Sequence, residues 1–400
     1  MAVTVLTGTL GVEDVLAGKQ VRDVTKGLYH KYQNINPLTA VMAKMPKGKA
    51  TVNPKKEFTR KDLLPRWDTV ASVATGSGAT LTLNFTSGTY FKVGDVVEFP
   101  QLATAATTTN IGVISAYTSP TATIKAIGYQ SNGAVTAATF AATVAAGMEV
   151  HILHDASEEY SQRPAMKVTK TEQDWNFINF PRAPFIIGNI EKDILQYTGD
   201  ERTERREETH RDIRIQMEEN LFHGERFYID GTNGRQFFGR GFKKFIKQGA
   251  GTNILNWASG LTEAEWDEFL LKGPCQAAIG GPVRFGFFSN DLYLKILEIG
   301  KAKERIVKDV NILGMSFDTY KAPGGIKIHM SVHHLLTNSY EGAGLIIDPT
   351  RARLVPYRNN PILAYHTELQ ENDRAGVSDE WRGLFTLEVD RVEPHAWIEK

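Results

Sequence analysis

Cysteine and net charge are what this 400-residue sequence has least of. The single cysteine, Cys275, excludes a disulfide framework within one chain and a cysteine-rich metal site, and it fits a reducing compartment. The 46 basic and 46 acidic residues cancel, which argues against a dedicated nucleic-acid-binding protein. No apolar run reaches the roughly 18 residues of a membrane span. The N-terminus also lacks the basic segment and apolar core of a signal peptide.

Catalytic and nucleotide-binding motifs are missing as well. The sequence holds no nucleophile elbow, P-loop, zinc-protease helix or dinucleotide-binding fingerprint. Two histidine groups could in principle ligate a metal: His151 and His154 with Asp155, and His329 with His333 and His334. No second cluster supports the first group, and we expect the second to be packed or to lie at an interface. We therefore predict no catalytic residue, no cofactor and no metal site.

Residues 191–223 predict one long helix, because they contain no proline and are mostly strong helix formers. Such a helix would be roughly 50 Å long. Its middle, from Asp200 to Asp212, has no apolar residue, so it must span solvent or lie against polar surfaces. It is either a solvated helix with ordinary salt bridges or a spine that meets charged neighbours in an assembly. The candidate contact residues are Glu201, Arg205, Arg206, Glu207 and Arg211.

Residues 1–66 are basic and weakly patterned, and four prolines after residue 36 interrupt any long helix. We expect an extended arm without a core of its own. The arm is either a loosely ordered tail or a segment that reaches a neighbouring subunit or a polyanion. The candidate basic contacts are Lys47, Lys49, Lys55, Lys56 and Arg60.

Between residues 70 and 148 the composition shifts to threonine, alanine, glycine and serine. Short alternating runs separated by turn residues predict a small all-β module. Residues 90–99 are expected to form a strand, a tight turn and a second strand. Because the flanking sequence has a different character, we expect the module to be an insertion, which is either structural or a binding module.

The second half of the chain indicates an α+β domain built around a sheet. After the long helix, Gly224 is expected to end it, and a glycine-rich connection follows. Residues 262–273 predict a capped helix and residues 292–306 a second one. The expected strands are 283–288, 307–320, 326–332, 344–348 and 383–390.

The order of these parts resembles that of the major capsid proteins of tailed bacteriophages, in the branch of the HK ninety-seven-like fold that has an inserted β-domain. Three stretches carry the resemblance: residues 36–40 with 57–60 and 67–68, the helix and its end at 191–224, and the closing segments 345–358, 383–388 and 394–398. The fold that the resemblance implies is α+β. Its parts would be an N-terminal arm with the start of the E-loop (1–66), an inserted β-rich domain (67–152), the rest of the E-loop and the P-domain with its spine helix (153–274), an A-domain (275–382) and a strand that returns to the P-domain (383–400).

The resemblance also implies a function. The chain would not be an enzyme but would assemble with itself, as hexamers and pentamers, into the icosahedral shell around the double-stranded DNA of a tailed phage. Portal and scaffolding proteins are expected partners, a cement protein is a further one, and the DNA contact would be non-specific. The protein would be found in the virion, after assembly in the bacterial cytoplasm. Some relatives cross-link neighbours covalently, but no partner residue for Lys55 or Lys56 is identifiable.

Two other functions compete with this one. The β module could make the chain a glycan-binding or accessory protein of the virion surface. Alternatively, His151, His154 and Asp155 could form the site of a metal-dependent enzyme.

Overall fold

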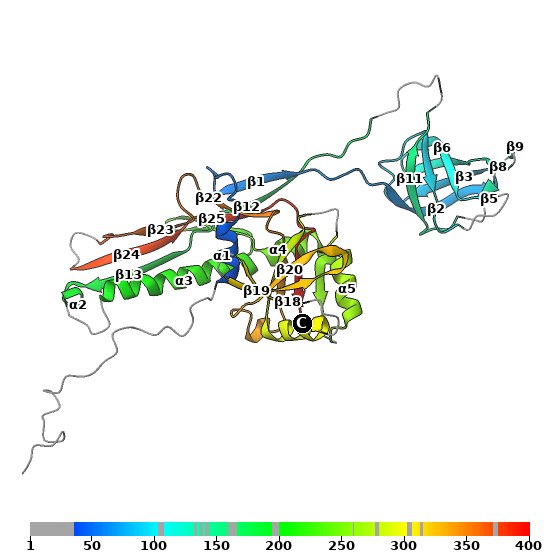
Figure 1. Cartoon of the computed structure of the whole chain (residues 1–400). Helices are drawn as coiled ribbons and strands as arrows, with labels where there is room; N and C mark the ends of the chain where they lie inside the picture. The colour runs from blue at the N-terminus through cyan, green and yellow to red at the C-terminus, as the bar shows by residue number, and fades with distance from the viewer. Residues whose placement is uncertain are drawn as a thin grey trace, which may run out of the picture. The chain divides into compact units, whose positions relative to one another are not determined.

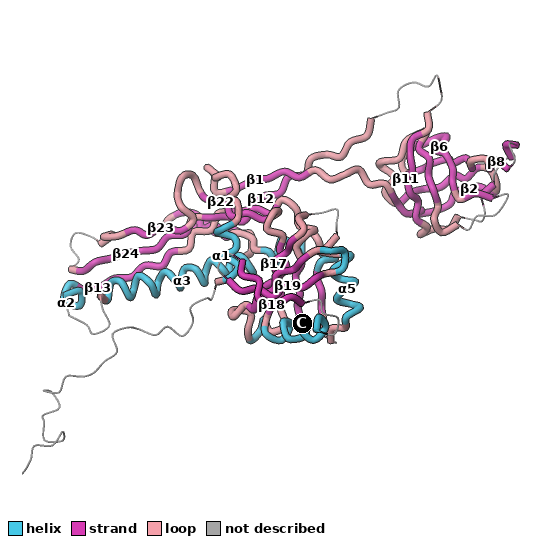
Figure 2. The backbone as a smooth tube through the Cα atoms, viewed as in Figure 1, coloured by secondary structure: helices cyan, strands magenta, loops and turns pink. Residues whose placement is uncertain are grey.

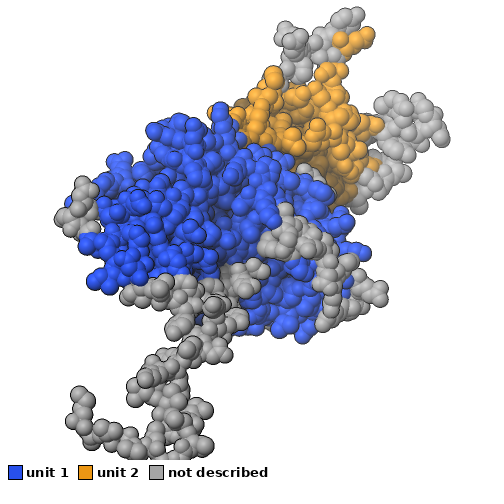
Figure 3. Space-filling model, turned by 60° about the vertical axis from the view of Figure 1, so that its left-hand side comes forward, with its two compact units in different colours: residues 1–59, 173–400 blue, residues 60–172 orange. Residues whose placement is uncertain are grey.

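The computed structural model describes residues 36–102, 108–131, 134–136, 139–140, 144–157, 159, 166–193, 200–258, 260–276, 280–301, 306–312, 315–370 and 375–400. The chain forms two compact units (Figure 3). Unit 1 consists of residues 1–59 and 173–400, and unit 2 of residues 60–172. Unit 2 therefore lies within the sequence of unit 1, so the chain passes from one unit to the other twice.

A seven-stranded mixed sheet forms one half of unit 1 (Figure 1). Its strands, in spatial order, are β16 (Ile254–Asn256), β26 (Ala396–Glu399), β21 (Gly344–Ile347), β17 (Val283–Phe288), β20 (Lys327–Val332), β19 (Met315–Lys321) and β18 (Ile306–Ile312). The helices α5 (Glu263–Lys272) and α6 (Asn290–Lys301) contribute buried side chains to a core with this sheet, among them Trp266 and Leu292. The predicted cap of α5 is present, because Thr262 and Glu265 bond to each other's backbone amides.

The long helix α3 (Glu201–His223) lies along a second sheet in unit 1 (Figure 2). This antiparallel sheet contains β13 (Arg182–Gly188), β24 (Gly376–Gly383) and β23 (Leu363–His366). The remaining elements of unit 1 are α1 (Pro37–Lys44), α2 (Asn189–Asp193), α4 (Phe242–Gly249), the pair β1 (Lys55–Arg60) and β12 (Glu172–Phe177), the pair β22 (Ala352–Pro356) and β25 (Phe385–Val389), the hairpin β14 (Phe227–Gly231) and β15 (Gly234–Phe238), and the 3-10 turns η3 (Gly251–Asn253), η4 (Pro323–Gly325) and η5 (Asn338–Tyr340).

One apolar core of unit 1 joins α1, α3 and α4 to the large sheet and to the β22–β25 pair. Leu38 of α1, Met217 of α3 and Phe245 of α4 are buried together with Phe285 and Trp397 of the large sheet. The apolar C-terminal end of α3 is thus anchored in the core, as its sequence predicts.

Unit 2 contains a closed barrel with the strand order β11 (Glu149–Asp155), β2 (Trp67–Ser77), β3 (Thr80–Phe85), β7 (Thr121–Ala126), β6 (Ile111–Thr118) and β4 (Asp95–Glu98). Two short pairs accompany it: β5 (Thr108–Thr109) with β10 (Thr139–Phe140), and β8 (Tyr129–Ser131) with β9 (Ala134–Thr136). Alternate residues of β3 point into the core, which includes Leu83, Phe85, Ile124 and Val150. The residues between them face outward, because successive side chains of a strand point to opposite faces.

Several predicted boundaries were wrong. The long helix begins at Glu201 and not at residue 191, because Asp200 has an extended backbone and caps the amide of Thr203. The predicted stretch at 194–199 lies outside the described residues, and α2 precedes it. The glycine-rich connection after α3 contains the β14–β15 hairpin, and residues 90–99 contain only the strand β4.

The N-terminal arm is not extended throughout. Residues 37–44 form the helix α1, since Pro37 stands in the first turn, where its missing amide hydrogen is not needed. Residues 1–35 of the predicted arm lie outside the described part of the chain. Helix α6 is described up to Lys301, the predicted stretch 302–305 lies outside the described part, and Ile306, predicted to end the helix, begins the strand β18.

Strand pairing crosses the predicted domain limits at 275 and 382. Strands β22, β23 and β24 fall inside that range but pair with β25 and β13, which fall outside it. Conversely, the terminal strand β26 joins β21 in the large sheet, where Leu345 is opposite Trp397. The large sheet therefore takes strands from both sides of each limit.

Candidate assembly surfaces

The polar half of α3 is held on the second sheet by one buried carboxylate, Asp379 of β24. Arg202 of α3 donates to both of its oxygens at 2.7 and 3.0 Å, Tyr365 donates at 2.7 Å, and the amide of Glu368 at 2.9 Å. Burial works against the charge of Asp379, but the hydrogen bonds from Arg202 and Tyr365 outweigh it and lower the pKa of the carboxyl. This helix therefore lies against a polar surface, which is one of the two arrangements that its composition allows.

A second contact lies one turn further along α3. The indole nitrogen of Trp381 donates to the backbone oxygen of Arg206 at 3.1 Å, and the ring of His210 lies 4.5 Å from that of Trp381. Burial lowers the pKa of His210. Because Asp379 and Trp381 are two residues apart on β24, both point to the same face of the sheet, toward the helix.

Three ion pairs run along α3 itself. Arg205 contacts Glu201 at 2.8 Å and Glu208 at 2.9 Å, while Arg211 and Glu207 are 3.9 Å apart. Exposed pairs of this kind contribute only about 0.3–0.5 kcal/mol each. That Glu201, Arg205, Arg206, Glu207 and Arg211 contact a neighbouring subunit stays a prediction.

The basic residues predicted to make contacts in the arm fall into two groups. Lys55 pairs with Glu57, Lys56 lies 3.7 Å from Glu388, and Arg60 lies 2.9 Å from Glu172. The Lys55 pair lies within β1, whereas the Lys56 pair holds β1 to β25 and the Arg60 pair closes the β1–β12 pair. Lys47 and Lys49 are exposed.

Glu218 forms a buried node that sequence patterns do not reveal. The amides of Leu38 and Thr39 donate to its two oxygens at 2.8 and 2.7 Å, and His333 Nε2 lies 2.8 Å from Oε1. A carboxylate of α3 therefore caps the first turn of α1, where the free amides favour a negative charge. The node ties α1 and the segment after β20 to the long helix.

The other candidate histidines are dispersed. His329 bonds to Thr319 at 2.8 Å, His334 is exposed, and His151 lies beside Glu149 at 3.4 Å. His154 and Asp155 lie near the end of β11. Across the described residues, no group of three or more histidine, cysteine or carboxylate side chains is placed to hold a metal.

The β14–β15 hairpin exposes apolar side chains on both faces, since Tyr228 is 45 % exposed on the face that contacts Phe177. Tyr228 and Phe237 pair across the strands and pack on Phe177, with ring centroids 6.0 and 5.3 Å away. The opposite face carries Phe227, opposite Phe238, and Ile229, opposite Gln236. Phe227, Ile229 and Phe238 are 58, 47 and 40 % exposed, so this face is an apolar patch on the surface.

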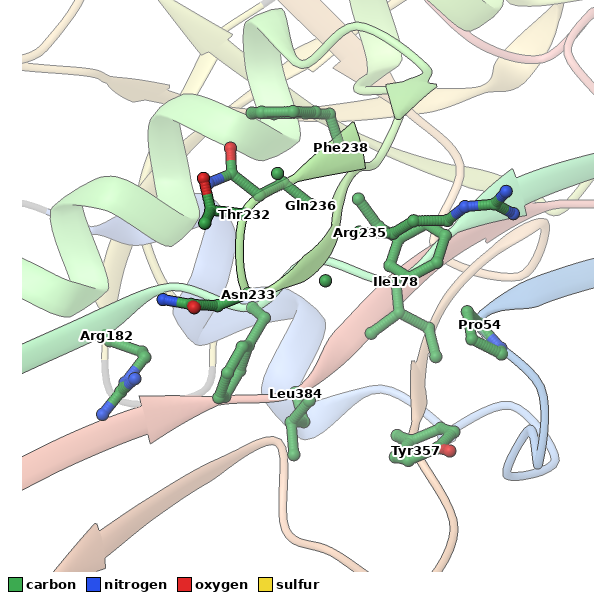
Figure 4. A pocket seen from close by; sticks show the side chains of 14 residues that line it. Pro54, Ile178, Arg182, Thr232, Asn233, Arg235, Gln236, Phe238, Tyr357 and Leu384 are labelled. Carbon is green, nitrogen blue, oxygen red and sulfur yellow. The ribbon is translucent and has the colours of Figure 1, made fainter. Parts of the chain in front are cut away.

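A groove of about 820 Å³ lies beside the hairpin (Figure 4). The hairpin lines one side from Gly231 to Phe238, and residues of several other segments line the rest, among them Pro54, Ile178, Phe180, Tyr357 and Leu384. Its two arginines are already paired, Arg182 with Glu380 and Arg235 with Asp230. The groove therefore presents mostly apolar side chains, without an uncompensated charge from these arginines.

The described surface thus presents a charged helix face, an exposed apolar hairpin face and an apolar groove. Together with the order of the chain's parts, these features are typical of a structural protein that works through contacts with other subunits. No helix in the described ranges combines the length and the apolar character that a membrane crossing needs.

The chain belongs to the SU10 major capsid protein family, whose family model matches residues 6–400. It is thus a capsid protein of the virion shell, it has a phage capsid fold, and its family is structural and not enzymatic.

Several solved structures match this chain at low sequence identity. A chain of Mycobacterium phage Bobi is 8 % identical, with 98 % of this chain and 99 % of that chain covered and a TM-score of 0.48. The SrpI encapsulin of Synechococcus elongatus is 13 % identical, with 58 % and 77 % covered and a TM-score of 0.42. The capsid of cyanophage P-SCSP1u is 10 % identical, with 62 % and 80 % covered and a TM-score of 0.40. No curated protein matches the chain.

Proposed function

We propose that this protein assembles as hexamers and pentamers into the icosahedral shell around the double-stranded DNA of a tailed phage, and that it does so in the cytoplasm of the host bacterium. The observation that carries the proposal is the family match, which runs over residues 6–400. The exposed apolar face of the β14–β15 hairpin supports it, because a subunit that stayed alone would leave that face in water.

The parts of the fold receive the roles that the resemblance implies. The sheet β13–β24–β23 with α3 would be the P-domain, and the large sheet with α5 and α6 the core of the A-domain. The β1–β12 pair would be the base of the E-loop, and the barrel at 67–152 an inserted domain. The strand pairing favours an A-domain that excludes β22–β24 and includes β26.

DNA and accessory proteins are further proposed partners. Lys47 and Lys49 are exposed and lie next to α1, so they are available for contact with phosphates, which would not depend on base sequence. Portal and scaffolding proteins would meet the subunit during assembly, and a cement protein would meet it in the finished shell.

Assembly of the purified full-length chain tests the proposal. Size-exclusion chromatography and negative-stain imaging across a series of salt and protein concentrations should show capsomers or closed particles. A chain that remains monomeric throughout, with or without its scaffolding protein, would contradict the proposed function.

A further inference from the structure

Another pocket, of about 380 Å³, lies at the end of the barrel where β11 finishes and β4 begins. Its volume falls in the range of about 300–1,000 Å³ that is usual for sites that bind small molecules. All of its lining residues belong to unit 2, so the pocket is a property of this unit alone. It combines basic, acidic and apolar side chains, and the shell function makes no use of them.

Strand pairing brings two carboxylates together in this pocket. Asp95, at the start of β4, is opposite Asp155, at the end of β11. The turn before β4 requires a glycine, since Gly94 has a φ of +93° and an added Cβ would lie 3.1 Å from Asp155 Oδ1. Lys92 contacts both carboxylates: its amide donates to Asp95 at 2.9 Å, and its Nζ donates to Asp155 at 2.6 Å. The side chain of Asp155 is still 32 % exposed, so it can also accept a hydrogen bond from a ligand.

Two cations of the pocket are not paired with a carboxylate. Among the described residues, the guanidinium of Arg66 has no hydrogen-bond or ion-pair partner. Lys167 Nζ donates to the backbone oxygen of Thr89 at 3.3 Å and lies 4.8 Å from the ring centroid of Tyr117. Burial lowers the pKa of Lys167, as expected for a cation that is partly removed from water without a carboxylate in contact. With Lys92, the pocket has three basic side chains against two carboxylates, so it favours a negatively charged ligand.

We propose that this pocket binds a sugar acid, which is a saccharide unit that carries a carboxylate beside its hydroxyl groups. Arg66 and Lys167 would hold the carboxylate through charge-assisted hydrogen bonds, and Asp155 would accept from a hydroxyl group. Leu64 and Met166, which are 38 and 87 % exposed, would cover the apolar face of the sugar ring. The site would attach the protein to acidic polysaccharides, which is an activity beyond the formation of a shell.

Other ligand classes fit the pocket less well. A phosphate group or a nucleic-acid backbone would bring its negative charge close to Asp155, which repels it. A neutral sugar would cover Arg66 and Lys167 without neutralising them, so their loss of water would not be compensated. A sugar acid satisfies the cations with its carboxylate and the acceptor with its hydroxyl groups.

Binding to the full-length chain, measured by titration with ligand-observed NMR, tests the proposal. The probes are glucuronate, galacturonate and mannuronate, each compared with glucose, galactose or mannose, which differs from it only at the last carbon. At least one acid should bind about 10-fold or more tightly than its neutral counterpart, because it alone forms the charge-assisted bonds. Failure of all three acids to bind, or equal binding of acid and neutral sugar, would overturn the proposal. So would inorganic phosphate that binds as tightly as the acid.

Substitution of the two cations locates the binding. Arg66→Ala and Lys167→Ala should each weaken binding of the sugar acid by about 10-fold, because each removes a charged donor. Lys125→Ala, at an exposed lysine on β7 of the same barrel, is the matched control and should leave the affinity unchanged. Equal losses in all three variants would show a general attraction to positive charge and would contradict the site.

Asp155→Ala distinguishes a saccharide site from a plain anion site. This variant lacks both an acceptor for hydroxyl groups and a negative charge that repels phosphate, so the preference for the sugar acid over inorganic phosphate should fall by about 10-fold. An unchanged or larger preference would overturn the proposal. Thermal unfolding checks that the barrel is intact, and if Asp155→Ala does not fold, the variants at Arg66 and Lys167 decide the question.

Discussion

At the scale of single residues, Asp379 holds the polar half of α3 on its sheet. Asp379→Asn should destabilise the unassembled subunit by about 1–3 kcal/mol, because Arg202 loses its charged partner and the bond from Tyr365 weakens. Urea unfolding at pH 7 measures this. Asp230→Asn, at an exposed pair with Arg235, is the control and should cost well under 1 kcal/mol.

The carboxylate of Asp379 also makes the free energy of unfolding depend on pH. Since the pKa of Asp379 is lowered in the folded chain, its contribution is complete above the pKa of an unfolded aspartate and is lost as the pH falls through the folded value. Stability of the wild type should therefore fall more steeply with acid than that of Asp379→Asn. Parallel curves for the two proteins would contradict this account.

His395 makes a second pH-dependent contribution to the free energy of unfolding. It is fully buried and accepts a hydrogen bond from the amide of Asp348 at 3.1 Å, and burial lowers its pKa from the usual 6.5 to about 3. Below pH 6.5 an unfolded histidine takes up a proton while the folded one stays neutral, so stability falls as the pH falls from about 6.5 toward 3. The loss should be on the order of 1–4 kcal/mol.

His395→Gln keeps an acceptor for that amide and removes the titration. Its unfolding free energy, measured from pH 7 to pH 4, should change less with pH than that of the wild type. The exposed His334→Gln should leave the slope unchanged. Identical slopes for all three proteins would show that burial of His395 does not govern the pH response.

At the scale of elements, Glu218 fixes the position of α1. Glu218→Ala leaves the first amides of α1 and the ring of His333 without their partner, so the loss should be about 2–4 kcal/mol. Hydrogen exchange should show lost protection at 37–44 before the rest of unit 1. Glu219→Ala, at the exposed neighbouring position, should leave that protection intact.

Asp200 decides where the long helix begins. It accepts hydrogen bonds from the amide and the hydroxyl of Thr203 at 3.1 and 2.8 Å. Asp200→Ala should cost about 1 kcal/mol and increase amide exchange in the first turn of α3. Asp212→Ala, in the middle of the same helix, should not expose that turn, and equal exchange in both variants would argue against a capping role.

Elements that depend on local signals could be predicted from the sequence. The capped helix α5, the strand β17 and the end of α3 at Gly224 all follow from residues within a few positions of each other. The contacts of the two buried carboxylates, Glu218 and Asp379, could not be predicted. Glu218 meets Leu38 across 180 positions, and Arg202 meets Asp379 across 177. Pairs so far apart produce no periodic pattern in a single sequence.

The hairpin was missed for a different reason. Phe227, Ile229 and Phe238 are apolar residues at exposed positions, whereas pattern arguments assign apolar residues to a core. The turn signal was present, since glycines stand at 231 and 234 on either side of the two-residue loop.

The charged face of α3 was predicted, but its assignment as a contact with a neighbour is still a prediction.

At the scale of the whole molecule, the two units have separate cores and should fold separately. Replacing residues 61–171 by the turn Asn-Gly would join Arg60 to Glu172, whose side chains already lie 2.9 Å apart across β1 and β12. We expect the shortened chain to fold, with thermal unfolding of unit 1 within a few degrees of its value in the full chain.

A fragment and a longer deletion serve as comparisons for that experiment. The fragment 66–157 should fold alone, because the barrel closes within it and its core lies inside these limits. A longer deletion, of residues 57–171, removes most of β1 and should be clearly less stable than the deletion of 61–171. Failure of both the fragment and the shorter deletion to fold would show that the units depend on each other.

The paired strands β1 and β12 have one more consequence. Because the polypeptide departs and returns through adjacent strands, two crossover points in the gene, one after the codons of β1 and one before those of β12, suffice to replace the barrel with an unrelated sequence. A guest whose own ends lie close together, such as an antigen or a fluorescent reporter, could be grafted there. A shell built from such subunits would then carry one copy of the guest for each subunit.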